Sequence, residues 1–137
     1  MRERMWNRMT DQEFNTLLIE AIKKHGPKLG ITPVDKLTIK ALKTCTAEGS
    51  VPATEPDPFL QARNSVIECG KVLFEDRDLS RIEGIVFSGA ANLNPTIVVM
   101  VVEDTTIRIN AYAKEGLINQ HTAQRAVKRI TELLESQ

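Results

Sequence analysis

Apolar residues along this chain of 137 residues follow two spacings, one typical of helices and one typical of strands. The most informative stretch is 97–102, where six apolar residues, four of them valines, follow one another without a break. A strand that is apolar on both faces is typical of the middle of a sheet that is covered on both sides. We therefore predict that a strand over 96–102 lies at the centre of the fold.

Four segments have the apolar spacing of amphipathic helices. The first begins at a capping box, Thr10 with Glu13, and Gly26-Pro27 ends it. His25 lies in its last turn, where the helix dipole favours a protonated imidazole. The other predicted helices run from Thr32 to Glu48-Gly49-Ser50, from Asp57-Pro58 to about Leu73, and from Asn119 or Gln120 to Glu135.

Three strands are predicted in the second half of the chain, over 81–88, 96–102 and 106–113. The last alternates strictly, and Arg108 and Tyr112 lie on its polar side, where we expect replacement of Arg108 to be tolerated. Both links between the strands are short, which favours an antiparallel meander. The predicted fold class is α+β: a three-stranded antiparallel sheet (meander) covered by helices, with the element order α-α-α-β-β-β-α.

The chain is predicted to form an N-terminal arm, 1–9, and a single α+β domain, 10–137. A Pro-rich loop, 49–58, lies inside this domain, because the two helices before it are too few to bury a core of their own. Gly70, inside the third predicted helix, is expected to permit the close approach of a neighbouring backbone.

Composition and charge favour a protein of the cytoplasm. Eighteen basic side chains balance eighteen acidic ones, and the N-terminus has no apolar core of a secretory signal. The two cysteines, Cys45 and Cys69, are expected to be free, buried thiols in a reducing compartment. We predict no membrane association.

Candidate catalytic and metal-ligating groups are sparse. No glycine-rich phosphate loop occurs, and Cys45, Cys69, His25 and His121 lack the spacing of a zinc site. Acidic side chains cluster at two turns, Glu75-Asp76-Asp78 and Glu103-Asp104. Convergence of Asp76, Asp104 and His121 would support a metal-dependent or hydrolytic enzyme, but carboxylates at turns more commonly act as caps and edge charges. We expect no metal and no cofactor.

A nucleic-acid-binding module is a second alternative. It would use Arg2, Arg4 and Arg8 of the arm with the helix face formed by Lys36, Lys40 and Lys43. The element order over 57–136 resembles that of double-stranded RNA-binding domains, which bear a lysine cluster where the last helix starts. The corresponding segment here, 119–123, has no lysine. We therefore assign no family and expect no nucleic-acid partner.

The sequence thus favours a small cytoplasmic interaction or regulatory module without catalytic activity, acting through protein contacts as a homodimer. The arm contains a tryptophan that is costly to leave in water, and a short sheet offers two open edges. The protein partner is left open. The candidate interface residues are Met5, Trp6 and Met9 of the arm, together with Arg108 and Tyr112.

Overall fold

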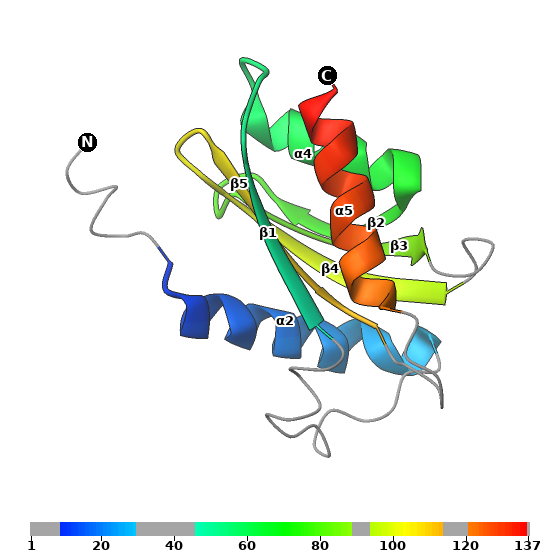
Figure 1. Cartoon of the computed structure of the whole chain (residues 1–137). Coiled ribbons are helices and arrows are strands. Elements are labelled where there is room, and N and C mark those ends of the chain that lie inside the picture. The colour runs from blue at the N-terminus through cyan, green and yellow to red at the C-terminus, as the bar shows by residue number, and fades with distance from the viewer. Residues whose placement is uncertain (1–8, 30–45, 89–93, 114–120, 137) are drawn as a thin grey trace.

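The computed structural model describes residues 9–29, 46–88, 94–113 and 121–136. In this part of the chain a five-stranded antiparallel sheet, in the order β1-β5-β4-β3-β2, lies between helix α2 on one face and helices α4 and α5 on the other (Figure 1). The elements in chain order are α2 (Asp11–His25), the 3-10 helix η1 (Gly26–Leu29), β1 (Thr46–Pro52), α4 (Pro58–Cys69), β2 (Gly70–Asp76), β3 (Arg81–Ser88), β4 (Asn94–Glu103), β5 (Thr106–Tyr112) and α5 (Thr122–Glu135).

Strand β4 occupies the centre of the sheet, as its apolar run predicts. Ile97, Val99 and Val101 pack against α2 on one face. Val98 and Met100 join the core under α4 and α5 on the other. Because side chains of a strand alternate between faces, both faces of β4 need apolar cover, and helices of the same chain supply it.

Helix α2 begins at the predicted capping box. The Glu13 amide donates to Thr10 Oγ1 at 3.1 Å, and the Thr10 amide donates to Glu13 Oε1 at 2.8 Å. Each bond satisfies a backbone donor that the first helical turn leaves unpaired. The apolar side of the helix, which packs on the sheet, comprises Phe14, Leu18, Ala21 and Ile22.

The predicted three-stranded meander with the element order α-α-α-β-β-β-α is wrong. Strands β1 and β2 extend the sheet by one strand at each edge, beside β5 and β3. Four strands, rather than three, separate α4 from α5, so the element order of double-stranded RNA-binding domains is not matched either.

Strand β1 replaces the predicted end of the second helix and the start of the predicted loop 49–58. It pairs with β5 from Thr46↔Tyr112 to Pro52↔Thr106. Its side toward α5 carries only Ala47, Gly49 and Val51, too little apolar surface to produce a recognisable strand pattern. The rest of the second predicted helix, through residue 45, lies outside the described residues.

Strand β2 replaces the predicted last turn of the third helix. Helix α4 ends at Cys69, and the strand begins at the next residue, Gly70. A Cβ at Gly70 would lie 1.9 Å from the carbonyl oxygen of Ile85. The close backbone approach expected at this glycine is therefore confirmed, but it occurs between two strands.

The remaining boundaries agree well with the sequence pattern. Strand β3 has the predicted bounds, and β5 alternates as expected, with Ile107, Ile109 and Ala111 in the core under α4 and α5. Asp57 is the N-cap of α4, where it accepts from the Leu60 amide at 3.1 Å, and α5 ends at Glu135. In the described part of the chain, no helix combines the length and apolar character that crossing a bilayer requires.

Candidate functional site

The two acidic turns lie at the same end of the sheet, and three of their carboxylates, those of Glu75, Asp76 and Glu103, serve local structural contacts. Glu75 pairs with Arg63 of α4 at 3.0 Å, and Asp76 Oδ1 accepts from the Leu79 amide at 3.2 Å inside the β2–β3 turn. Glu103 pairs with Arg108. Among the described residues, no group of three His, Cys, Asp or Glu side chains is placed to hold a metal ion.

His121 lies far from these turns. It is the N-cap of α5, in a left-handed conformation with φ 55°. The other end of α5 is tied to the acidic end of the sheet, because Gln61 Nε2 donates to the Leu134 carbonyl and to Thr54 Oγ1. The neighbouring Ala53 amide donates to the Thr105 carbonyl in the β4–β5 turn. The length of α5, about 20 Å, therefore separates His121 from Asp104.

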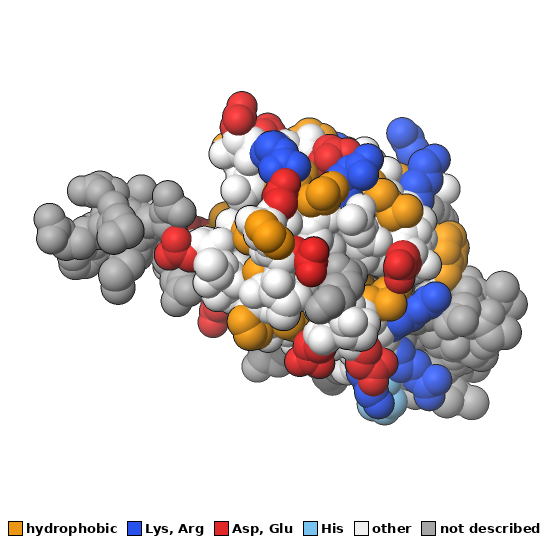
Figure 2. All heavy atoms as spheres, turned by 90° about the horizontal axis from the view of Figure 1, so that it is seen from above, with side chains coloured by type: hydrophobic (Ala, Val, Ile, Leu, Met, Phe, Trp, Pro, Cys, Tyr) orange, Lys and Arg blue, Asp and Glu red, His pale blue; other side chains and the backbone are white. Residues whose placement is uncertain are grey.

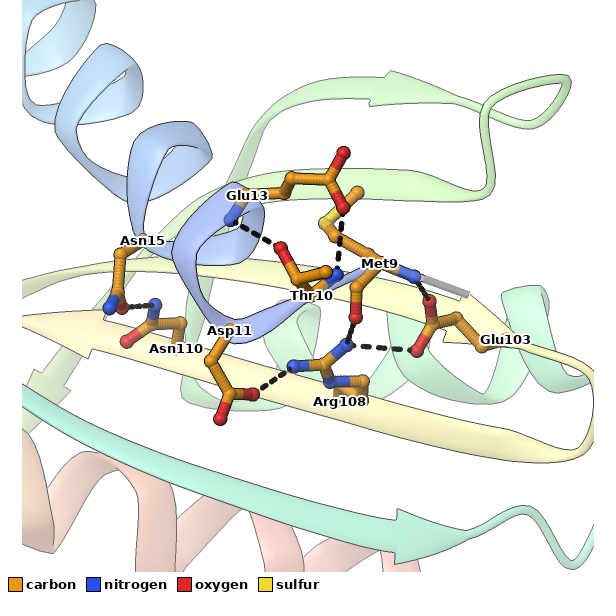
Figure 3. A network of polar contacts seen from close by, with 8 residues as sticks. All are labelled: Met9, Thr10, Asp11, Glu13, Asn15, Glu103, Arg108 and Asn110. Carbon is orange, nitrogen blue, oxygen red and sulfur yellow. Dashed lines mark hydrogen bonds and ion pairs between the residues drawn. The ribbon is translucent and has the colours of Figure 1, made fainter. Parts of the chain in front are cut away.

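A network of polar contacts at the start of α2 is centred on Arg108 (Figure 3). Its guanidinium donates to the Met9 carbonyl at 2.6 Å, to Glu103 Oε1 at 3.0 Å and to Asp11 Oδ1 at 2.9 Å. The Met9 amide donates to Glu103 Oε2 at 2.5 Å. The side chain of Arg108 is only 14% exposed and also lies over the Phe14 ring, 4.7 Å from its centroid. These contacts fix the first turn of α2 on the sheet.

Two carboxyl groups near this network have perturbed pKa values of opposite sign. Glu48 of β1 is largely exposed, yet partial desolvation of its carboxyl group, together with the Asp11 charge, raises its pKa above the ordinary range, although Arg108 opposes the shift. Hydrogen bonds from Thr10 lower the pKa of Glu13. The former carboxylate is destabilised in the folded protein and the latter is stabilised by its capping role.

A second polar contact lies under the other end of α2. His25 Nε2 and Lys24 Nζ each lie 2.9 Å from Glu83 Oε1, and the side chains of His25 and Glu83 are 11% and 7% exposed. The Lys24 ammonium also lies over the ring of Phe74, 4.2 Å from its centroid. A buried carboxylate with two basic neighbours is a hydrogen-bonded anchor between α2 and β3.

An apolar surface remains exposed on the outer side of α4. Leu60 and Ile67 are 42% and 47% exposed, and Arg63 lies between them at helical spacing. Because Arg63 reaches Glu75 of β2, this side of the helix lies beside that strand, which is the outermost strand of the described sheet at this edge. We call the exposed side chains of Leu60 and Ile67, with the outer edge of β2, the α4–β2 surface.

The sequence offered one signal for this surface. Leu60 and Ile67 are seven residues apart and fall outside the inward stripe of Phe59, Ala62 and Val66. Such side chains are ordinary when single, and only their position beside an edge strand makes the pair noteworthy.

Several sequence-predicted site residues lie inside the chain's own packing or outside the described residues. Met9 and Arg108 belong to the network at the start of α2, and Tyr112 is buried beneath that helix. Replacement of Arg108 is therefore no longer expected to be tolerated. Outside the described residues lie Met5 and Trp6 of the predicted interface, the arginines of the arm, Arg2, Arg4 and Arg8, and the lysine face, Lys36, Lys40 and Lys43.

Cys69 and the charged surface provide no reactive site in the described residues. Burial in the core under α4 raises the pKa of the Cys69 thiol, which disfavours the reactive thiolate.

On the face seen from above, acidic and basic side chains are interspersed, with apolar side chains between them (Figure 2). The described side chains on that face form no continuous field of one sign that would attract a polyanion.

Comparison with known proteins does not assign this fold and surface to a class. No family model, no curated protein and no solved structure matches the chain.

Proposed function

We propose that this chain is a small interaction or regulatory module without catalytic activity, and that it acts through protein contacts as a homodimer. The observation that carries the proposal is the α4–β2 surface. There, two large apolar side chains are exposed on the helix that leads directly into β2, a strand whose outer edge has no partner strand in the described sheet. Edge strands and apolar patches are both surfaces that proteins use to bind other chains.

The placement of the charged side chains supports the absence of catalysis. Three of the five candidate acids, Glu75, Asp76 and Glu103, hold an ion pair, a turn and the start of a helix. Catalytic groups are instead expected to face a shared space in which a substrate can bind. Binding of another protein chain therefore explains the exposed residues of the described structure better than catalysis does.

A cytoplasmic location belongs to the same proposal. Cys69 is a free, buried thiol within the described residues, which suits a reducing compartment.

The solution mass of the intact chain tests the proposal. We expect the mass of a dimer by light scattering and sedimentation at tens of micromolar. Ile67→Glu places a charge on the α4–β2 surface and is expected to shift the population toward the monomer. Gln124→Glu adds the same charge to the exposed side of α5 and is the matched control. A monomeric mass of the intact chain rejects the homodimer.

The predicted role of the arm is tested separately. A chain that begins at Met9 lacks Met5 and Trp6 but keeps the backbone groups that contact Glu103 and Arg108. A fall in the dimer fraction on this truncation is expected if the arm contributes to the interface. A dimer that persists unchanged assigns assembly to the rest of the chain.

A further inference from the structure

Strand β2 presents its backbone groups to the outside along one edge. Within the described residues it pairs only with β3, from Gly70↔Val86 to Asp76↔Arg81. The N–H and C=O groups of an edge strand that point away from its neighbour can pair with another chain. Any such pairing must also place compatible side chains opposite one another on each face of the sheet.

The side chains of β2 do not alternate regularly, because the register shifts between Val72 and Phe74. Val72 packs with the core under α4, whereas Phe74 lies under Lys24 of α2. Glu75 returns to the α4 side, where it meets Arg63. Alternation on either side of this bulge consequently places Lys71 and Asp76 on the α2 face of the sheet.

This arrangement is self-complementary in charge. In an antiparallel pair of β2 strands related by a two-fold axis between Leu73 and Phe74, Lys71 lies opposite Asp76 of the partner subunit, and Val72 lies opposite Glu75 of the partner subunit. Both pairs match in sheet face. Because the axis repeats every contact, Lys71 meets Asp76 twice.

Other registers of the same strand are less favourable. A two-fold axis through Lys71 or through Glu75 opposes two like charges, which destabilises a cross-strand pair. In a register that places Lys71 opposite Phe74, opposite side chains still point to the same face of the sheet. The Lys71 ammonium then has no carboxylate directly opposite it. Charged side chains on an edge strand usually prevent it from pairing with other chains. Here the charges of Lys71, Glu75 and Asp76 disfavour the other registers and so favour one.

We propose that a second copy of this chain pairs with β2 in this antiparallel register, with Lys71 opposite Asp76 of the partner subunit. The proposal rests on the homodimer proposed above and identifies its interface. A second copy is the occupant that fits, because the sequence of β2 supplies both members of each charge pair.

The exposed side of α4 supports the same geometry. Arg63 shows that this side of the helix faces the β2 edge, and Leu60 and Ile67 lie on it at the adjacent helical positions. Two-fold pairing of the β2 strands brings this side of α4 toward the same side of α4 in the partner subunit. Leu60 and Ile67 then exchange water for apolar contact across the axis, and the two sheets become continuous.

Charge reversal with complementation tests the register. Lys71→Glu opposes two carboxylates across the axis at both repeats, and Asp76→Lys opposes two ammonium groups. We expect each variant alone to raise the dimer Kd by about tenfold or more. An equimolar mixture of the two variants restores both opposite-charge pairs, so it is expected to form a heterodimer with an affinity near that of the unchanged protein.

The mixture also controls for folding, because a misfolded variant does not restore assembly. Lys128→Glu and Glu132→Lys make matched reversals on the exposed side of α5 and are expected to leave the dimer unchanged. Dimers of Lys71→Glu and Asp76→Lys as tight as the unchanged protein overturn the register while leaving the homodimer intact. Weakened variants that unfold cooperatively, and so are folded, but remain monomeric when mixed overturn it as well. A monomeric unchanged protein rejects the proposed function and, with it, this interface.

Discussion

The Nε2 atom of His25 lies 2.9 Å from Oε1 of Glu83, although 58 residues separate them in the chain. The sequence position of His25 predicts only a favourable interaction with the helix dipole. In the structure it also forms a tertiary contact between α2 and β3. Lys24 approaches the same oxygen, so that one buried carboxylate joins two consecutive residues of the last turn to the sheet.

Replacement of Glu83 by alanine is expected to lower the free energy of unfolding by about 3 kcal/mol, because it leaves the buried imidazole of His25 without its partner. Urea unfolding followed by circular dichroism measures the change. Glu132→Ala removes an exposed carboxylate from α5 and is expected to stay within about 0.5 kcal/mol. Equal losses for the two variants would contradict an anchoring role for Glu83.

Arg108 is expected to be a major determinant of how α2 is attached. Arg108→Ala removes the donors to Met9, Asp11 and Glu103 and should cost about 3 kcal/mol, since the carboxylate of Glu103 stays largely buried. The double variant with Glu103→Ala should lose less than the sum of the two single changes. Arg77→Ala, at an exposed ion pair, is the control, with an expected loss below about 1 kcal/mol. Additive losses at Arg108 and Glu103 would show that the two side chains act independently.

A charged side chain at the centre of the sheet is expected to prevent folding. Val99 is fully buried between β4 and α2, so Val99→Asp should prevent cooperative folding, because a carboxylate there has neither water nor a partner. Val99→Ala should still fold, with a loss of about 2 kcal/mol. Thermal melts of both variants provide the measurement. A cooperative melt of Val99→Asp near the temperature of the unchanged protein would contradict the central position of β4.

The junction between α4 and β2 is expected to require glycine. Gly70→Ala would push a methyl group against the backbone oxygen of Ile85 and should cost about 3 kcal/mol or more. At Gly49 the nearest atom to an added Cβ is Val127 Cγ1 at 2.7 Å, which belongs to a side chain and not to the backbone. Gly49→Ala should therefore cost less than Gly70→Ala, about 1–2 kcal/mol. The opposite order of melting temperatures would exclude this account of the junction.

A pH dependence of stability is expected from Glu48. Its pKa is higher in the folded chain than in the unfolded chain, so the folded chain binds more protons between the two values. Stability is therefore lost as the pH rises through this interval. At neutral pH, Glu48→Gln should stabilise the protein by less than about 1 kcal/mol, because water screens the carboxylate. The gain should disappear at a pH below the ordinary carboxyl range.

Glu13→Gln should show the opposite sign and serves as the control for Glu48. The pKa of Glu13 is lowered in the folded chain, so its charge stabilises the fold above the ordinary carboxyl range, and this contribution is lost as the pH falls through the lowered value. Denaturant unfolding at several pH values compares the two variants. Parallel pH profiles for both variants would contradict the assignment.

Local physical rules were sufficient for much of this fold. The capping box at Thr10 and the N-cap at Asp57 follow from the orphan donors of any helix start. The continuous apolar run of β4, the alternation in β5 and the stripe of α5 are periodic patterns that reflect burial directly. These features place five of the described elements, α2, α4, β4, β5 and α5, from the sequence by itself, and they place β4 at the centre of the sheet.

Tertiary structure decided the edges of the sheet and the fate of the polar groups. The residues of β1 have little apolar surface, and those of β2 continue the helical pattern of α4, so only pairing with β5 and β3 makes them strands. Arg108 lies at a polar position of an alternating strand, which predicts exposure to solvent, but α2 covers it in the folded protein. His25 contacts Glu83 only because the fold brings α2 and β3 together. The α4–β2 surface likewise depends on tertiary pairing, because residues 70–76 become an edge strand next to α4 only when they pair with β3.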